Sequence, residues 1–214
     1  MKKNLLILWA FFGTAAVGGC GALFSPGTPP VYYRIWASGP DPAVPCSRTK
    51  SEPLRVWPLD GAPPYDRTDI VLLRDPNMVE LSSRHRWIAP PGEMSAQVVL
   101  EALSRARIFS VVDRPGGAGF SPQLNLGGHI RQFAFHLREG SGEAVLDVRV
   151  FLWRETTPKA LVFEKDYRVS EPVPDGASPQ RFAEAMNRAV GKWVEELSRD
   201  LCQSPLDGTR SPSP

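Results

Sequence analysis

The side chains in this sequence that could act as nucleophiles or metal ligands include three cysteines and three histidines among 214 residues. They are Cys20, Cys46, Cys202, His85, His129 and His136. A zinc site needs cysteine, histidine or carboxylate ligands at a spacing that brings them together. The three histidines are isolated and show no such spacing. We therefore expect no metal and no other cofactor.

The sequence motifs of several enzyme classes are also missing. The chain contains no Gly-x-Ser-x-Gly nucleophile elbow and no His-Glu-x-x-His zinc motif. The glycine-rich segment 116–119 lacks the Gly-Lys-Ser/Thr ending of a phosphate-binding loop, so it predicts a surface connection. We therefore expect a binding or scaffolding protein rather than an enzyme.

The N-terminal segment has the order of a secretory signal peptide over residues 1–19. Two lysines precede the apolar run Leu5–Phe12, and small residues then lead to Cys20. A transmembrane anchor is the alternative, but only fifteen residues separate Asn4 from Cys20, fewer than the roughly 20 that a spanning helix needs. Val17-Gly18-Gly19-Cys20 resembles the lipobox of bacterial lipoproteins, in which cleavage precedes a cysteine that carries a diacylglycerol. We expect Cys20 to be lipidated.

Lipidation would tether the following domain to a membrane through acyl chains such as palmitate. Residues 20–30 then form the lipidated linker. Gly21 stands where lipoproteins of the inner membrane often carry Asp. The resemblance to lipoproteins thus implies the periplasmic face of the outer membrane.

The net charge depends on the same segment. Lysine and arginine number 25 and acidic residues 23, which gives a formal net charge of +2. Cleavage before Cys20 removes Lys2 and Lys3 and leaves these charges balanced. A balanced surface is not suited to neutralising many phosphates, so we expect no nucleic-acid partner.

Cys46 and Cys202 remain once Cys20 is acylated. In an oxidising compartment such a pair tends to form a disulfide. The bridge would tie the start of the domain to its last helix and close a long loop. The alternative is two unpaired thiols.

Hydrophobic periodicity predicts a single α/β domain over residues 31–202, with a disordered tail at 203–214. Short strands are expected at 31–36, 54–59, 69–74 and 108–112, and helices at 93–107 and from Pro179 to Leu201. Ser178 is the expected cap of the second helix. The fold class is a mixed or mostly antiparallel sheet with two principal helices.

Three long strands are expected to form an antiparallel meander, at 124–138, 144–152 and 161–169. In the first of them the apolar residues change parity near Arg131-Gln132. One extra residue in a strand moves all later side chains to the other face. The sequence therefore predicts a β-bulge at this point.

One segment is basic and aromatic and ends in two prolines, running from Arg84 to Pro91. Its first four residues, Arg84, His85, Arg86 and Trp87, combine charge with apolar area. Such a segment could bind lipid head groups or an acidic partner. The alternative is a strand end whose Trp87 fills the core beneath the first helix.

The same region resembles a known family on an ordered set of residues. The set is Tyr65-Asp66-Arg67-x-x-Ile70-Val71, Arg74, His85-x-Trp87-x-x-Pro90, the helix with Leu100 and Leu103, and the strand Phe109–Val112. It is similar to the ABC-type transport auxiliary lipoproteins, the paraquat-inducible protein C type, which accompany MCE-domain transport systems. The chain departs from the family pattern in lacking one residue before Asp66 and in having Ile88 after Trp87.

The resemblance implies a three-layer α/β domain without catalytic activity. It also implies an MCE-domain protein as partner, with an ABC permease and an ATPase in the inner membrane. Such systems move phospholipid or other hydrophobic molecules between the two membranes. We expect an exposed sheet edge or the Arg84–Pro91 segment to bind the partner. Whether the chain also forms a homo-oligomer stays open.

Two other classes of function stay open as well. One is a structural or regulatory outer-membrane lipoprotein that binds cell-wall or Tol-type assemblies. The other is a periplasmic hydrolase, which would need a deep pocket with two converging titratable groups.

Overall fold

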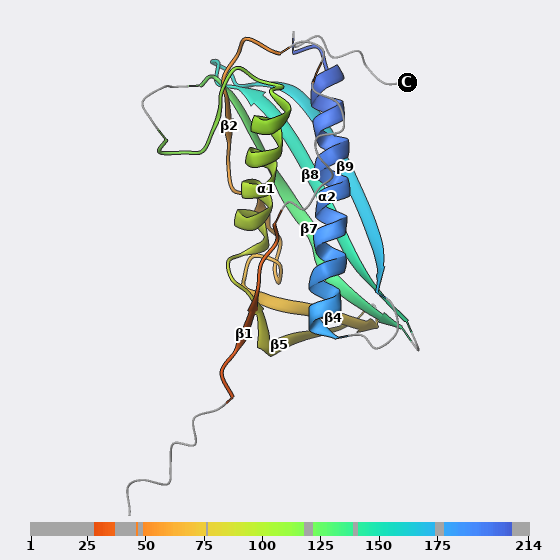
Figure 1. Cartoon of the computed structure of the whole chain (residues 1–214). Helices are drawn as coiled ribbons and strands as arrows, with labels where there is room; N and C mark the ends of the chain where they lie inside the picture. Colours follow the sequence, from red (N-terminus) through yellow and green to blue (C-terminus); the bar gives the residue numbers. More distant parts are fainter. Residues whose placement is uncertain are drawn as a thin grey trace, which may run out of the picture.

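Figure 1 shows the computed structural model of the chain, in which residues 28–36, 46, 49–75, 77–117, 122–138, 141–173 and 178–206 are described. The expected signal peptide and the lipidation site Cys20 lie outside these residues, as does most of the expected tail. The described chain is an α/β domain with a mixed sheet and two helices, which confirms the expected fold class.

Nine strands form one sheet in the described chain. They are β1 (Val31–Tyr33), β2 (Leu54–Val56), β3 (Asp60–Gly61), β4 (Asp69–Asp75), β5 (Met78–Trp87), β6 (Val112–Asp113), β7 (Leu124–Arg138), β8 (Ser141–Arg154) and β9 (Ala160–Val173). The three longest, β7 to β9, form the expected antiparallel meander. The pairing of β7 with β8 shifts register between Ile130 and Gln132, which confirms the bulge.

The other edge of β7 is shared by three shorter strands. Along its length β7 pairs in parallel first with β2, then with β3 and then with β4. Strand β5 continues the sheet as an antiparallel partner of β4, and β1 pairs in parallel with the last residues of β5. The β4–β5 hairpin is thereby fixed at the end of the sheet where β7 finishes.

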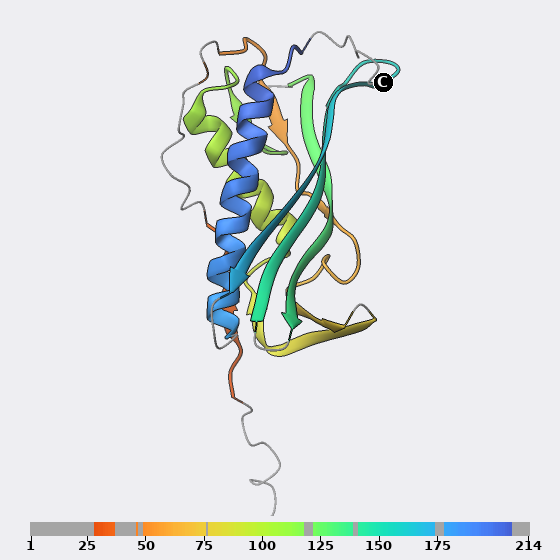
Figure 2. The same cartoon turned by 90° about the vertical axis from the view of Figure 1, so that its right-hand side faces the viewer.

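Both helices cover the same face of the sheet, as Figures 1 and 2 show. Helix α1 (Pro91–Ala106) contacts β2, β3 and β7, while α2 (Pro179–Gln203) lies on β8 and β9 and against α1. The hydroxyl of Ser178 accepts the backbone N–H of Arg181 at 3.3 Å and caps α2 as expected. The expectation of three layers is corrected, because one sheet face buries the apolar stripes of both helices and the described residues form two layers.

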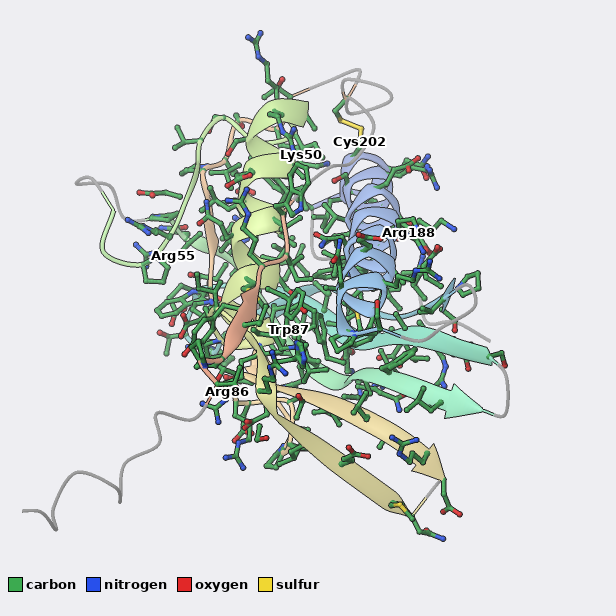
Figure 3. All side chains as sticks on the ribbon, turned by 60° about the horizontal axis from the view of Figure 1, so that its bottom comes forward. Lys50, Arg55, Arg86, Trp87, Arg188 and Cys202 are labelled. Atoms are coloured by element: carbon green, nitrogen blue, oxygen red, sulfur yellow. A yellow bond between two sulfur atoms is a disulfide. The ribbon has the colours of Figure 1, made fainter. Side chains whose placement is uncertain are left out.

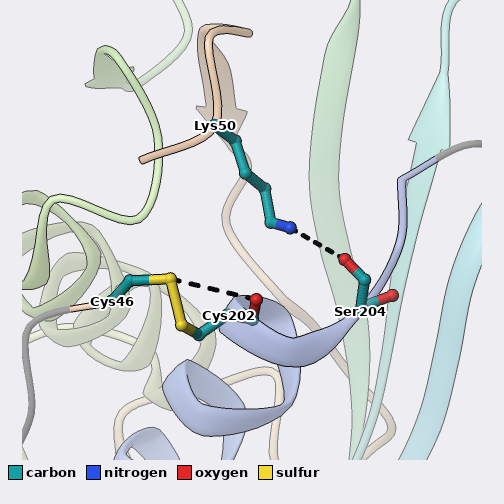
Figure 4. Close-up of a disulfide and its surroundings, with 4 residues drawn as sticks. All are labelled: Cys46, Lys50, Cys202 and Ser204. Atoms are coloured by element: carbon teal, nitrogen blue, oxygen red, sulfur yellow. Dashed lines mark hydrogen bonds between the residues drawn. A yellow bond between two sulfur atoms is a disulfide. The ribbon is translucent and has the colours of Figure 1, made fainter. Parts of the chain in front are cut away.

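A disulfide joins Cys46 to Cys202 near the end of α2, which confirms the expected bridge (Figure 4). The two Cα atoms are 5.7 Å apart, and 156 positions separate the cysteines in the sequence. Beside the bridge, Lys50 Nζ donates a hydrogen bond to the carbonyl of Ser204 at 2.8 Å. These contacts fasten the chain before β2 to the C-terminal end of α2.

Removal of the bridge by Cys46→Ser together with Cys202→Ser should lower the free energy of unfolding by about 2–5 kcal/mol, because the unfolded chain regains the freedom of a long loop. Denaturant unfolding measures this loss. Dithiothreitol should destabilise the parent chain to a similar extent and leave the double variant unchanged. Equal stability of parent and variant without reductant would contradict the prediction.

Candidate binding surfaces

The Arg84–Trp87 segment is the last part of β5, and its side chains divide between a buried ion pair, the core and the surface. Arg86 donates to Asp69 Oδ1 at 3.0 Å, and Arg67 Nε lies 2.8 Å from Asp69 Oδ2. The Asp69 side chain is only 8% exposed, so the two arginines replace the water that a buried carboxylate loses. Arg86 therefore helps to hold β5 against β4.

Trp87 is fully buried, as the alternative interpretation of this segment required. Its ring meets Phe133 edge-on with centroids 5.4 Å apart, and Phe182 of α2 lies 5.9 Å away. Figure 3, which brings this end of the molecule forward, labels Trp87 and its neighbour Arg86. Trp87 thus packs the core between sheet and helix, and the expectation of a partner contact through Trp87 itself is corrected.

His85 and Arg84 lie beside β1. The hydroxyl of Tyr33 and Nδ1 of His85 are hydrogen-bonded at 3.0 Å. Burial raises the pKa of Tyr33, and the nearby charge of Arg84 opposes this rise. Arg84 is exposed and Ile88 is 64% exposed. Within the basic aromatic segment, these two residues offer the most surface to a partner.

Asp69→Ala should lower the free energy of unfolding by about 1–3 kcal/mol, because Arg86 and Arg67 lose the carboxylate that orders this junction. The matched control is Asp166→Ala, which removes an exposed carboxylate 3.0 Å from Arg131 and should cost less than about 0.5 kcal/mol. Urea unfolding of both variants measures the difference. Equal losses in the free energy of unfolding would show that the buried ion pair stabilises the fold no more than the exposed one.

A second surface lies on the sheet face opposite the helices, where an aromatic row gathers around the start of β7. We define the aromatic row as Trp57, Phe151 and Trp153. Trp57 Nε1 donates to Asn125 Oδ1 at 2.9 Å, and the rings of Phe151 and Trp153 have centroids 5.8 Å apart. A Cβ at Gly127 would stand 3.0 Å from the Trp153 ring, so glycine lets that ring lie close to the strand.

Sequence reasoning missed the aromatic row. The signal was the alternation of Phe151 and Trp153 with the inward-facing Val150 and Leu152. Alternation alone places the two rings on the outer face. It does not indicate that Trp57, almost a hundred residues earlier, joins them, because this depends on the parallel pairing of β2 with β7.

Charged side chains occupy the middle of this outer face on β7, β8 and β9. Arg131 lies 2.7 Å from Asp147 and 3.0 Å from Asp166, and Arg149 lies 2.6 Å from Glu164. Exposed pairs of this kind contribute little to stability. They make the centre of the outer face polar beside the aromatic row.

A groove of about 460 Å³ runs between α1 and the chain that follows β2. Its lining includes Trp57, Pro58, Leu100, Glu93, Gln97 and Arg114. It holds one carboxylate and one guanidinium, whereas hydrolysis by a carboxylate pair needs two acidic groups that converge. The lining thus offers apolar contact area with one charge of each sign.

A cluster of titratable groups lies between β9 and α2. The Tyr167 hydroxyl donates to Asp200 Oδ2 at 2.7 Å, and Lys165 Nζ reaches Asp200 at 2.8 Å and Glu196 at 2.9 Å. Burial, with help from the Asp200 carboxylate, raises the pKa of Tyr167 well above its usual range. Hydrogen bonds to Asp200 and Glu196 raise the pKa of Lys165. The cluster fastens the last helix to the sheet.

The raised pKa of Tyr167 predicts a loss of stability in alkali. Its ordinary pKa is 10.0, so above this pH the unfolded chain releases a proton that the folded chain retains, and unfolding becomes easier. Tyr167→Phe should lower stability at neutral pH, and its difference from the parent chain should shrink as the pH rises above 10. Urea unfolding between pH 7 and 11 measures this, with Tyr32→Phe as control. A difference that does not change with pH would contradict the assignment.

Two further observations concern only the described part of the chain. No group of three or more histidine, cysteine or acidic side chains is arranged to hold a metal ion there. Neither of the two helices combines the length and the apolar composition needed to cross a bilayer.

The sequence and the fold both resemble known proteins. The sequence model of a family described as "ABC-type transport auxiliary lipoprotein component" matches residues 37–198. A crystal structure from Xanthomonas campestris, assigned to the family DUF330, superposes with a TM-score of 0.67 at 18% identity, covering 80% of this chain and 95% of that chain. The crystal structure of an uncharacterized protein gives a TM-score of 0.62 at 11% identity, covering 81% and 99%. A comparison with curated proteins gives no match.

Proposed function

Because the chain belongs to the family of ABC-type transport auxiliary lipoprotein components, we propose that it is the non-catalytic auxiliary subunit of an MCE-type transport system. In this proposal the chain is fixed to the outer membrane and faces the periplasm. Its partners are an MCE-domain protein and, through it, an ABC permease and ATPase. The system moves phospholipid or other hydrophobic molecules between the inner and outer membranes. The observation that carries the proposal is the family match over residues 37–198.

Anchoring through Cys20 is part of the proposal. The basic start, the apolar run and the lipobox-like Val17-Gly18-Gly19-Cys20 support it. The disulfide between Cys46 and Cys202 is consistent with an oxidising compartment. Several acyl chains on one cysteine would hold the domain at the membrane more firmly than a single chain.

A role without catalysis is supported by how the described charged groups are used. Asp69 is neutralised by two arginines at the junction of β4 and β5, and Asp200 binds Tyr167 and Lys165. Both carboxylates fasten one element of the fold to another. The chain would then act on the cargo only through its partners.

The proposed partner contact includes Arg84, with His85 and Arg86 holding the strand end beneath it. Arg84 is exposed, whereas His85 and Arg86 are committed to Tyr33 and Asp69. An exposed guanidinium can bind a carboxylate in two-point fashion. The partner surface should therefore be acidic where it meets this strand.

Affinity purification from detergent extracts tests the proposed system. The full lipidated chain, carrying a C-terminal tag after Pro214, should recover an MCE-domain protein, and chemical cross-linking in intact cells should join the two. Recovery of cell-wall or Tol-type proteins instead, with no MCE-domain protein by either method, would overturn the proposal.

Arg84→Glu should weaken recovery of the MCE-domain protein by about tenfold, because a charge that attracts the partner becomes one that repels it. The matched control is Arg199→Glu on the exposed face of α2, where Arg199 pairs with Glu195 at 3.0 Å. Quantitative mass spectrometry of the purified complexes measures both. Equal recovery by the two variants would remove Arg84 from the interface.

A further inference from the structure

The β4–β5 hairpin carries an apolar patch that the core does not use. We define the hairpin patch as Met78, Val79 and Leu81, whose exposed fractions are 54%, 51% and 38%. Val79 and Leu81 are two residues apart on β5, so their side chains lie on one face of the strand. Met78, the first residue of β5, is exposed beside them at the tip of the hairpin. Leu73 of β4 stands opposite Val79 in the register and extends the apolar face. A protein surface rarely keeps neighbouring large apolar side chains in water without a use for them.

The hairpin patch lies at the end of the molecule from which the N-terminal segment departs. Strand β1 pairs directly with the end of β5, through Val31 opposite His85. Figures 1 and 2 show the chain leaving this end, below the β4–β5 hairpin, while the C-terminal end of α2 lies at the opposite end. We call the end formed by β1, β4 and β5 the tether end.

The length of the linker limits which surfaces can reach a bilayer. Between Cys20 and Thr28 the chain can extend at most about 28 Å. Helix α2 has 25 residues and runs the length of the domain for about 37 Å. The far end, with the disulfide, is therefore beyond the reach of a linker that starts at the tether end. A bilayer that holds Cys20 through this linker therefore lies within about 28 Å of Thr28, at the tether end.

We propose that the hairpin patch rests in the interfacial region of the phospholipid bilayer to which the chain is tethered. The inference depends on the proposed function, because it requires an acylated Cys20. The tether raises the local concentration of lipid around the hairpin, so a contact too weak to hold the domain by itself is still populated. The second attachment fixes the orientation of the domain, with its far end directed away from the membrane.

The charges around the patch favour an apolar contact over recognition of a particular head group. Arg74 pairs with Glu80 at 2.9 Å, and Asp75 and Arg84 lie close by on the same two strands. Positive and negative charges are thus balanced. The hairpin has to stay at interfacial depth, because a sheet edge within the hydrocarbon core would leave backbone groups without hydrogen bonds.

A second copy of the chain is a less suitable occupant of this patch. A stable dimer buries about 800 Å² on each partner. Three partly exposed side chains offer much less than that area, and the linker places the bilayer at this end of the domain. A lipid surface needs no complementary shape and accommodates a small patch.

Site-directed fluorescence on the full lipidated chain tests the inference. Val79→Cys, labelled with an environment-sensitive nitrobenzoxadiazole dye, is reconstituted into vesicles of phosphatidylethanolamine and phosphatidylglycerol. The new thiol is the only reactive one once Cys20 is acylated and the native pair is bridged. We expect a blue-shifted emission and strong quenching by lipids that carry a doxyl group. The matched control is Lys159→Cys in the turn between β8 and β9, which should show neither.

A further variant tests whether the native apolar side chains, rather than the dye, place the hairpin at the lipid. Met78→Ser combined with Leu81→Ser should remove most of the quenching at position 79, because the patch loses its apolar neighbours, and both residues are exposed, so the fold should persist. Quenching at both labelled positions alike, or at neither, would overturn the inference while leaving the anchor intact. A blue shift that increases with the protein-to-lipid ratio, and does not respond to the fraction of quencher lipid, would assign the patch to a contact with a second copy of the chain. Vesicles that fail to carry the protein on flotation would refute the anchor, and with it the inference, without bearing on the transport partners.

Discussion

The fold depends on the pairing of β7 along both of its edges. One edge carries β8 over nearly the full length of the strand, and the other carries β2, β3 and β4 in succession. The bulge between Ile130 and Gln132 divides these partners, because β3 ends opposite Ile130 and β4 begins opposite Ala134. A shift of one residue in this register would turn the apolar side chains of β7 away from the helices.

The end of β5 joins this framework to the tether end. Trp87 reaches Phe133 of β7 and Phe182 of α2, and the adjacent Arg86 holds the buried Asp69 of β4. One short segment therefore connects the central strand, a helix and the neighbouring strand. This explains why a segment that is basic and aromatic in sequence is largely structural, and why Arg84 and Ile88 are its most exposed residues.

The parts of the fold that the sequence predicted are those with a strong local period. Helix α2 follows an apolar stripe from Phe182 to Leu201, and the three long strands alternate cleanly. The apolar pattern did not predict strand β5 as a whole. Glu80, Ser82 and Ser83 interrupt its apolar residues, and most of its side chains are exposed. The aromatic row and the single helix layer depend on pairing between distant strands, which no local pattern encodes.

The two ends of the domain differ in how firmly they are constrained. At the far end, the disulfide and the Lys50 hydrogen bond fasten the chain before β2 to α2, and Asp200 fastens α2 to β9. At the tether end, the β4–β5 hairpin extends past the helices and presents apolar side chains to its surroundings. A rigid body that is bound only through its tether end transmits the orientation of that end to the aromatic row on its outer face. The proposed bilayer contact would therefore determine which way this surface faces relative to the membrane.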